Sequence, residues 1–245
     1  MDPPAMNFLG DVLSWFSDGD NWRGPSGVPS RLLEHVHYTL AAVLCALVLA
    51  GPIAVWLGHK RRFGTAAMSV ANIGQTLPSF AILVLAVQAV GIGSRPVVGP
   101  FALWLAMALL AVPPIFTNAY TGVAEVDDAI RDAARGMGMS TRQQVLRVEI
   151  PAAAPVLLTG VRIATVQVVA TSTIGAYAGT GGLGRFIIDG FALQEYPEVF
   201  AGALLVALLA LGVDRALAIA ERRARPGRRA ARPIDLKRET SRPIA

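Results

Sequence analysis

Five long apolar runs divide this sequence of 245 residues, and they constrain its fold more than any other feature. A helix needs about 20 mostly apolar residues to cross the hydrocarbon core of a bilayer, and each run is of that length and apolar on all sides. Only 16% of the residues are charged, against about 25% in soluble domains, and the mean hydropathy is +0.50. The composition argues against a large soluble bundle and predicts an all-α integral membrane protein with about five transmembrane helices, near residues 37–57, 66–90, 100–120, 155–178 and 199–220.

The runs divide the chain into three parts. Residues 1–34 combine tryptophan and phenylalanine with acidic residues, which suits either a helix at the membrane surface or a disordered arm. Residues 35–221 contain the apolar runs and form the transmembrane domain. Residues 222–245 form a basic tail that we expect to be disordered and close to anionic lipid.

Lysine and arginine gather in alternate loops. They follow the first, third and fifth runs, beginning with Lys60, Arg61 and Arg62, whereas the intervening loops carry only Arg95 and Arg185. Basic loops remain in the cytoplasm, so the chain is predicted to cross the cell membrane several times, with its N-terminus outside and its C-terminus in the cytoplasm. Basic residues that flank apolar runs indicate membrane topology rather than a nucleic-acid partner.

The loop of residues 122–151 is the longest of the predicted cytoplasmic loops. Apolar residues recur at helical spacing from Val126 to Met137, and the charged residues between them, Arg131 included, are assigned to the wetter side of this helix. Gly136 and Gly138 then interrupt the pattern, because glycine readily adopts the backbone conformation that ends a helix.

A second short helix follows the glycines. Ser140 with Gln143 three residues later forms a capping-box pattern, and Pro151 is expected to end this helix and open the next. Two short helices at a glycine corner suit docking in a groove of another protein. An amphipathic connector lying on the membrane is the alternative that the pattern leaves open.

The same loop resembles the EAA loop of ABC-importer permeases. That family pattern is Glu-Ala-Ala, three residues, Gly, nine residues and then Ile-x-Leu-Pro, and this sequence matches every spacing. The departures are Asp132 for Glu, Val148 for Ile and Ile150 for Leu. The resemblance implies that an ATPase is coupled to transport through this loop, and the loop residues expected to take part are Asp132, Ala133, Ala134, Gly136, Gly138, Val148, Ile150 and Pro151.

Other segments resemble the osmoprotectant branch of these permeases. They are NIGQTLPS from Asn72, GIGSRP from Gly91, TNAYTGV from Thr117 and GAYAGTGGLG from Gly175. The resemblance implies a type I importer in which two permease subunits, the same chain twice or a paralogue, form the pathway. Separate cytoplasmic ABC ATPase subunits would drive it, and a separate extracytoplasmic binding protein would deliver glycine betaine, carnitine or choline.

In such an importer this chain carries no catalytic residue, metal site or cofactor, and the partner ATPase binds ATP and Mg. A permease for methionine or another amino acid shares the same plan and stays open. A channel or secondary transporter that works without ATP is the remaining alternative.

Polar side chains within the runs are candidates for function because lipid penalises them. They either line the translocation pathway or hydrogen-bond helices to one another, and they are Asn72, Gln75, Thr76, Gln167, Thr171 and Ser172. Arg162 and Asp214 are the charged residues farthest inside the runs. We predict that they face the bundle interior and form an ion pair, with snorkelling of Arg162 toward the interface as the alternative.

Two further patterns invite a misleading interpretation. Gly179, Gly181 and Gly184 have the spacing of the dinucleotide-binding fingerprint, but they follow an apolar run rather than a strand. We therefore expect a turn of small residues that lets a binding protein or a neighbouring helix approach the backbone closely. The histidines lie at the ends of the runs without metal-ligand spacing, and we expect interfacial positions for His35, His37 and His59.

Overall fold

The computed structural model describes residues 5–62 and 98–224, together with residues 66, 68, 69, 81 and 85. All regular elements in this described part are helical, which confirms the predicted fold class. Four of its helices are long and apolar enough to cross a membrane, and they correspond to the predicted first, third, fourth and fifth spans. The predicted second span, residues 66–90, lies outside the described residues apart from those isolated positions.

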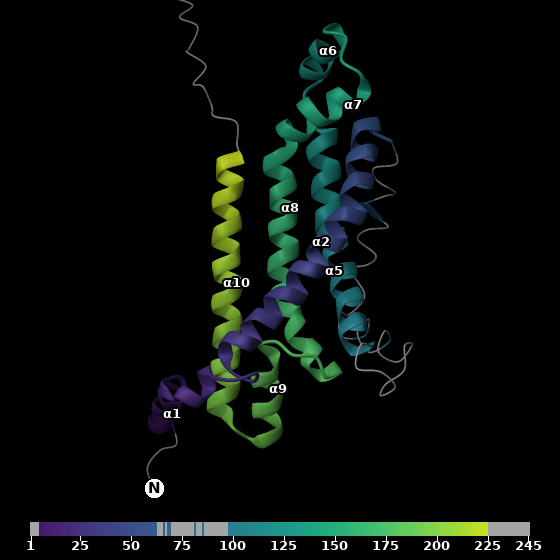
Figure 1. The fold of residues 1–245 in the computed structure, drawn as a ribbon. Helices are drawn as coiled ribbons and strands as arrows, with labels where there is room; N and C mark the ends of the chain where they lie inside the picture. The colour runs from purple at the N-terminus through teal and green to yellow at the C-terminus, as the bar shows by residue number, and fades with distance from the viewer. Residues whose placement is uncertain are drawn as a thin grey trace, which may run out of the picture.

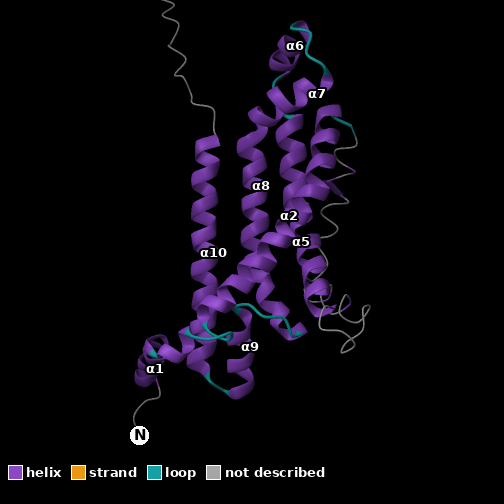
Figure 2. Cartoon of the chain, viewed as in Figure 1, coloured by secondary structure: helices purple, strands orange, loops and turns teal. Residues whose placement is uncertain are grey.

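The transmembrane bundle is built from α2 (Val28–Lys60), α5 (Val98–Ala124), α8 (Ile150–Thr171) and α10 (Tyr196–Ala224). Helix α2 runs obliquely and packs on α5 and α8, while α10 packs on the other side of α8 (Figure 1). The C-terminal ends of α2, α5 and α10 lie at one end of the bundle, which we call the loop end. The loops that connect α5 through α10 are short (Figure 2).

Small residues allow α2 to approach its neighbours closely. Alanine recurs at every fourth position of α2, so that Ala42, Ala46, Ala50 and Ala54 are all buried in the core shared with α5 and α8. The opposite face of α2 exposes large apolar side chains, such as Leu44. Close packing of small residues and an apolar outer face are the arrangement that a helical bundle in lipid requires.

Gly160 of α8 lies directly against α5. An added Cβ there would be 2.6 Å from Asn118 Cβ and 2.8 Å from the Pro114 carbonyl oxygen. We therefore expect Gly160→Ala to separate α8 from α5 and to lower the melting temperature of the chain in detergent, against the usual gain of about 1 kcal/mol for Gly→Ala in a helix. Gly51→Ala in α2 is the matched control, because its Cβ would meet only Leu47 Cδ1 at 3.6 Å. Equal stability of the two variants would contradict this packing.

The N-terminal segment forms α1 (Ala5–Ser17) and the 3-10 turn η1 (Gly19–Trp22). Phe8 of α1 contacts the ring of Phe200 in α10, and Trp15 contacts Phe186 in α9 (Gly184–Leu193). Of the two possibilities left open for this segment, the structure therefore contains a helix, and it packs against the end of the bundle opposite the loop end. Helix α2 begins well before the predicted run, because Pro29 suits the first helical turn.

The glycine motif after α8 forms a turn of close approach, as predicted. It follows the 3-10 helix η3 (Ser172–Ala178) rather than a strand. Gly182 has a positive φ of 90° and donates its N–H to Glu34 Oε2 of α2 at 2.8 Å. A Cβ at Gly181 would overlap the same carboxylate, so these glycines allow the turn to lie against α2.

The coupling loop and the intramembrane charges

The predicted helix pair is present at the loop end. Helix α6 (Asp128–Gly136) is capped by Asp127, whose carboxylate accepts the Ala129 N–H at 2.8 Å. Gly138 follows with a φ of +75°, a conformation in which a side chain would be strained. The capping box of Ser140 and Gln143 then opens α7 (Thr141–Gln144), with both of its reciprocal hydrogen bonds formed.

Pro151 opens the next helix, as predicted, but it does not end the second one, and that part of the expectation was wrong. Helix α7 continues through a π-helical turn, η2 (Val145–Glu149), directly into α8, and Pro151 lies in the first turn of α8. The wider π turn accommodates a residue that has no N–H to donate to the preceding turn. The loop is therefore continuous with the fourth predicted span rather than hinged at the proline.

The residues that resemble the family pattern divide by exposure. Asp132, Ala133, Gly136, Gly138 and Pro151 are exposed. Ala134 is buried, and Val148 and Ile150 are half-buried. Asp132 forms an exposed ion pair with Arg135 of the same helix at 3.3 Å. Apolar side chains are also exposed on the loop, among them Ile130 and Met137, so the loop presents a mixed polar and apolar surface.

A buried ionic network, which the sequence patterns did not reveal, anchors α6 to the bundle. Arg131 is only 4% exposed, and its Nη1 lies 3.1 Å from Glu149 Oε1. The Arg131 guanidinium also donates to the Val123 carbonyl oxygen at 2.6 Å and to the His59 carbonyl oxygen at 3.2 Å. Burial lowers the pKa of Arg131, whereas the charge of Glu149 acts in the opposite direction.

His59 completes this network, which we call the anchor network and define as His59, Arg131 and Glu149. The His59 Nδ1 lies 3.0 Å from both carboxylate oxygens of Glu149, which is 1% exposed. Assigning Arg131 to the wetter side of its helix was therefore wrong, and His59 contacts a buried carboxylate rather than lying free at the interface. Glu149 was not singled out from the sequence, because no local pattern distinguishes it from an exposed loop residue.

Arg61 attaches α6 to the ends of two further helices. It ends α2 in a left-handed conformation with a φ of 48°. Its guanidinium donates to the Ala124 and Val126 carbonyl oxygens at 2.9 Å each, and to Asp128 Oδ1 at 2.7 Å. Together with the anchor network, these bonds fix α6 to the loop-end termini of α2, α5 and α8, so a displacement of α6 acts on three helices at once.

The structure brings Arg162 and Asp214 together between α8 and α10. Arg162 Nε lies 2.6 Å from Asp214 Oδ1, and its Nη2 lies 3.0 Å from Oδ2, which is a two-pronged ion pair. Arg162 Nη1 also lies 3.4 Å from Glu221 Oε2. Glu221 was not predicted, although its position seven residues after Asp214 places both carboxylates on one face of α10.

The candidate pathway residues separate into two groups. Asn72, Gln75 and Thr76 lie outside the described residues. Gln167 and Thr171 are half-buried, and the Thr171 hydroxyl donates to the Gln167 carbonyl oxygen at 2.8 Å within the same helix.

Ser172 is buried and lies in a contact between helices. Its Oγ is 2.7 Å from His35 Nε2 of α2, and that nitrogen lies 3.0 Å from the Val169 carbonyl oxygen. His35 is 1% exposed, so the interfacial position expected for it was wrong. These bonds hold α2 against the end of α8, which is the helix-packing role that the sequence left open for Ser172.

Long apolar helices packed as a bundle, with a short helix anchored at the loop end, are the architecture of a membrane transport subunit. Comparison with known proteins identifies the family to which this subunit belongs. Residues 39–226 match the family described as "Binding-protein-dependent transport system inner membrane component". The chain belongs to this family of multi-pass membrane proteins, and its residues form a permease subunit of an ABC transport system.

Relatives within the family are named for osmoprotectants. The chain is 35% identical to the choline transport system permease protein OpuBB of Bacillus subtilis, over 80% of this chain and 88% of that protein. It is 34% identical to the carnitine transport permease protein OpuCD of Listeria monocytogenes, over 94% of this chain and 98% of that protein. It is 36% identical to the osmoprotectant import permease protein OsmY of Salmonella typhimurium, over 79% of this chain and 80% of that protein.

A solved structure supports the fold. The chain superposes on a chain of the MetNI methionine ABC transporter in an inward-facing conformation with a TM-score of 0.70. The alignment covers 81% of this chain and 96% of that chain, at 20% sequence identity. At this identity the similarity establishes the helical arrangement and not the solute.

Proposed function

We propose that this chain is the permease subunit of a binding-protein-dependent ABC importer for quaternary-ammonium osmoprotectants such as glycine betaine, carnitine or choline. The single observation that carries the coupling part of the proposal is the anchored α6, whose exposed surface projects from the loop end (Figure 1) while its base is bonded to three helices. The names of the relatives support the solute class.

The chain's partners supply the chemistry that it lacks. Separate ABC ATPase subunits bind ATP and Mg, and α6 docks in a groove on the ATPase surface. A second permease subunit, the same chain or a paralogue, completes the pathway, and a separate extracytoplasmic binding protein delivers the solute. The loop end faces the cytoplasm, because the exposed Lys60, Arg62, Arg222 and Arg223 all lie there; the N-terminus is outside and the C-terminus inside.

Coupling follows from the way in which α6 is held. Closure of the ATPase subunits on ATP displaces α6. Because Arg61 and Arg131 bond α6 to the ends of α2 and α5, and Glu149 begins the continuous helix into α8, the displacement moves these helices together. A rigid-body movement of this type exposes the pathway alternately to the two sides of the membrane.

Reconstitution in vesicles tests the proposal. The chain, with its ATPase and binding protein, is expected to accumulate labelled glycine betaine, carnitine or choline only when ATP is supplied on the cytoplasmic side. Methionine is the matched control solute. Preferential uptake of methionine would contradict the solute class, and uptake by the chain without ATPase would instead support a channel or secondary transporter.

The glycine corner provides a sharper test of coupling. Gly138→Val places a β-branched residue at a positive φ, which costs about 1–2 kcal/mol or more, so α6 is expected to reorient and uptake to fall several-fold. The amount of ATPase that co-purifies should fall in parallel, while membrane insertion is unchanged. Gly212→Val in α10 is the control, since that glycine is exposed, without a positive φ and without neighbours that a Cβ would meet. Full uptake by the Gly138 variant would contradict the role of the corner.

A further inference from the structure

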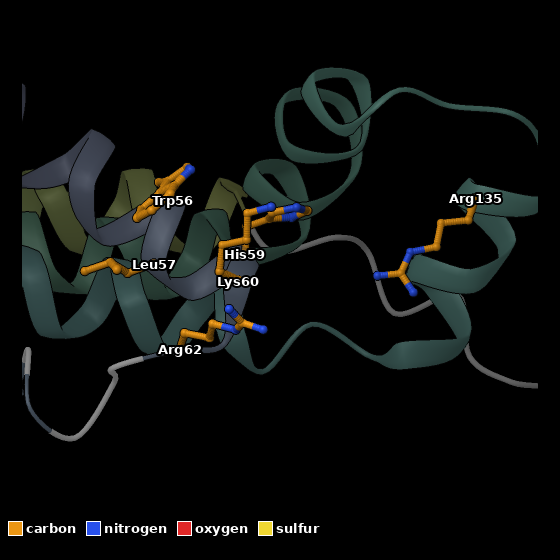
Figure 3. A pocket seen from close by; sticks show the side chains of 6 residues that line it. All are labelled: Trp56, Leu57, His59, Lys60, Arg62 and Arg135. Carbon is orange, nitrogen blue, oxygen red and sulfur yellow. The ribbon is translucent and has the colours of Figure 1, made fainter.

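A cationic pocket lies at the loop end, between the end of α2 and helix α6. It has a volume of about 500 Å³, and Figure 3 shows the six side chains that line it, which are Trp56, Leu57, His59, Lys60, Arg62 and Arg135. The guanidinium groups of Arg62 and Arg135 point toward the space between them from opposite sides (Figure 3). Neither solute transport nor docking of α6 requires a ligand at this position.

The charges that face the pocket are incompletely balanced. Lys60 and Arg62 are exposed and form no ion pair with any residue that the structure describes. Arg135 has one partner, Asp132, in an exposed pair, and His59 is held by Glu149. The pocket therefore suits an anion with several acceptor oxygens, since lysine and arginine both bind phosphate oxygens well.

The depth of the pocket in the membrane indicates where such an anion comes from. Residues 38–58 of α2 contain no Asp, Glu, Lys, Arg or His. At 1.5 Å per residue this uncharged stretch is about 30 Å long along the oblique helix, so it can lie within the hydrocarbon core, and the charged residues begin where it ends. Trp56 is 60% exposed near the end of this stretch, where tryptophan marks the interface with the headgroups. Lys60 lies one helical turn beyond Trp56 and on the same face, which places its ammonium group at the level of lipid phosphates.

We propose that this pocket binds the phosphate headgroup of an anionic phospholipid such as phosphatidylglycerol or cardiolipin. Lys60 and Arg62 bind the phosphate oxygens from the α2 side, and Arg135 closes the pocket from the α6 side. Trp56 and Leu57 pack against the glycerol and the first methylenes of the acyl chains. The bound lipid bridges the end of α2 to α6, next to the anchor network.

Lipid retention by the purified full chain tests this site. The chain is mixed in detergent with equal amounts of phosphatidylcholine and phosphatidylglycerol, and the retained lipids are counted by native mass spectrometry. We expect the chain to retain more phosphatidylglycerol than phosphatidylcholine. In the double variant Lys60→Gln, Arg62→Gln the ratio of the two retained lipids should fall about tenfold. The double variant Arg222→Gln, Arg223→Gln is the control, because it removes two exposed charges from the same end of the bundle on α10.

Three results would overturn the proposal. One is equal retention of the two lipids by the unmodified chain, and another is unchanged preference in the variant of Lys60 and Arg62. The third is displacement of the retained lipid by millimolar inorganic phosphate, which would assign the pocket to a free anion. If the variant of Lys60 and Arg62 keeps its preference for phosphatidylglycerol but no longer co-purifies with the ATPase, these two charges contact the ATPase surface instead.

Discussion

Replacing Glu149 with alanine is expected to lower the free energy of unfolding by about 3–5 kcal/mol, because it leaves the Arg131 charge buried without its carboxylate. Arg131 is 4% exposed and its Nη1 lies 3.1 Å from Glu149 Oε1, so bulk water does not solvate the charge that loses its partner. The measurement is the melting temperature of the chain in detergent, together with uptake and ATP hydrolysis by the reconstituted transporter. Uptake should fall further than ATP hydrolysis, since α6 would still contact the ATPase but would no longer be fixed to α8.

Glu125→Ala is the matched control for Glu149, because Glu125 is an exposed carboxylate between α5 and α6. A second variant distinguishes the effect of losing the ion pair from the effect of leaving one charge buried without a partner. The combination Arg131→Met, Glu149→Leu removes both charges and is expected to recover part of the stability, as apolar replacement of a buried ion pair often does. Wild-type stability of Glu149→Ala would contradict the anchor network.

Reversing one charge of the Arg162–Asp214 pair is expected to reduce uptake several-fold. Arg162→Asp would bring its new carboxylate close to Asp214 and Glu221 on α10, and Asp214→Arg would bring two guanidinium groups together. Both changes should separate α10 from α8, the helix on which α10 makes its most extensive contact within the described residues. The measurement is ATP-dependent uptake, with the amount of inserted chain determined in parallel.

The exchange of both charges distinguishes a pair from two independent residues. The double variant Arg162→Asp, Asp214→Arg restores an attraction between α8 and α10, and its uptake should exceed that of either single variant. Recovery should be partial, because Glu221 lies 3.4 Å from Arg162 and would then face a carboxylate at position 162. If the double variant transports no better than the single variants, the pair does not hold the two helices together.

Local patterns in the sequence predicted much of the fold because they depend on neighbours along the chain. Apolar runs of sufficient length predicted the four spans that the structure describes, and a capping box with a glycine corner predicted α6 and α7. A helix start or end depends on residues within one turn, so Ser140, Gln143 and Gly138 were sufficient to place these helices. Pro151 misled because the π turn that accommodates it has no comparable sequence signal.

The partners of charged and polar residues could not be predicted in the same way. His59 and Glu149 are 90 positions apart, and His35 and Ser172 are 137 positions apart. On its own helix Arg131 stands among charged residues and looks exposed, and only the packing of α6 against the ends of α2 and α8 buries it. The Arg162–Asp214 pair could be predicted because an unpaired charge within a span is costly in lipid, so a charge there usually has a partner. The charged residues of the loop can be solvated by water, so the sequence did not require them to pair.

The sequence by itself therefore determined that this chain crosses a membrane, how its spans are separated and that two short helices joined at a glycine corner lie between two of them, since apolar length and helix capping act locally. Only the tertiary structure decided which residues hold that loop to the spans. The reason is physical: a buried ion pair is stable only where distant helices exclude water from both partners at once, and that condition is met by packing rather than by any one segment.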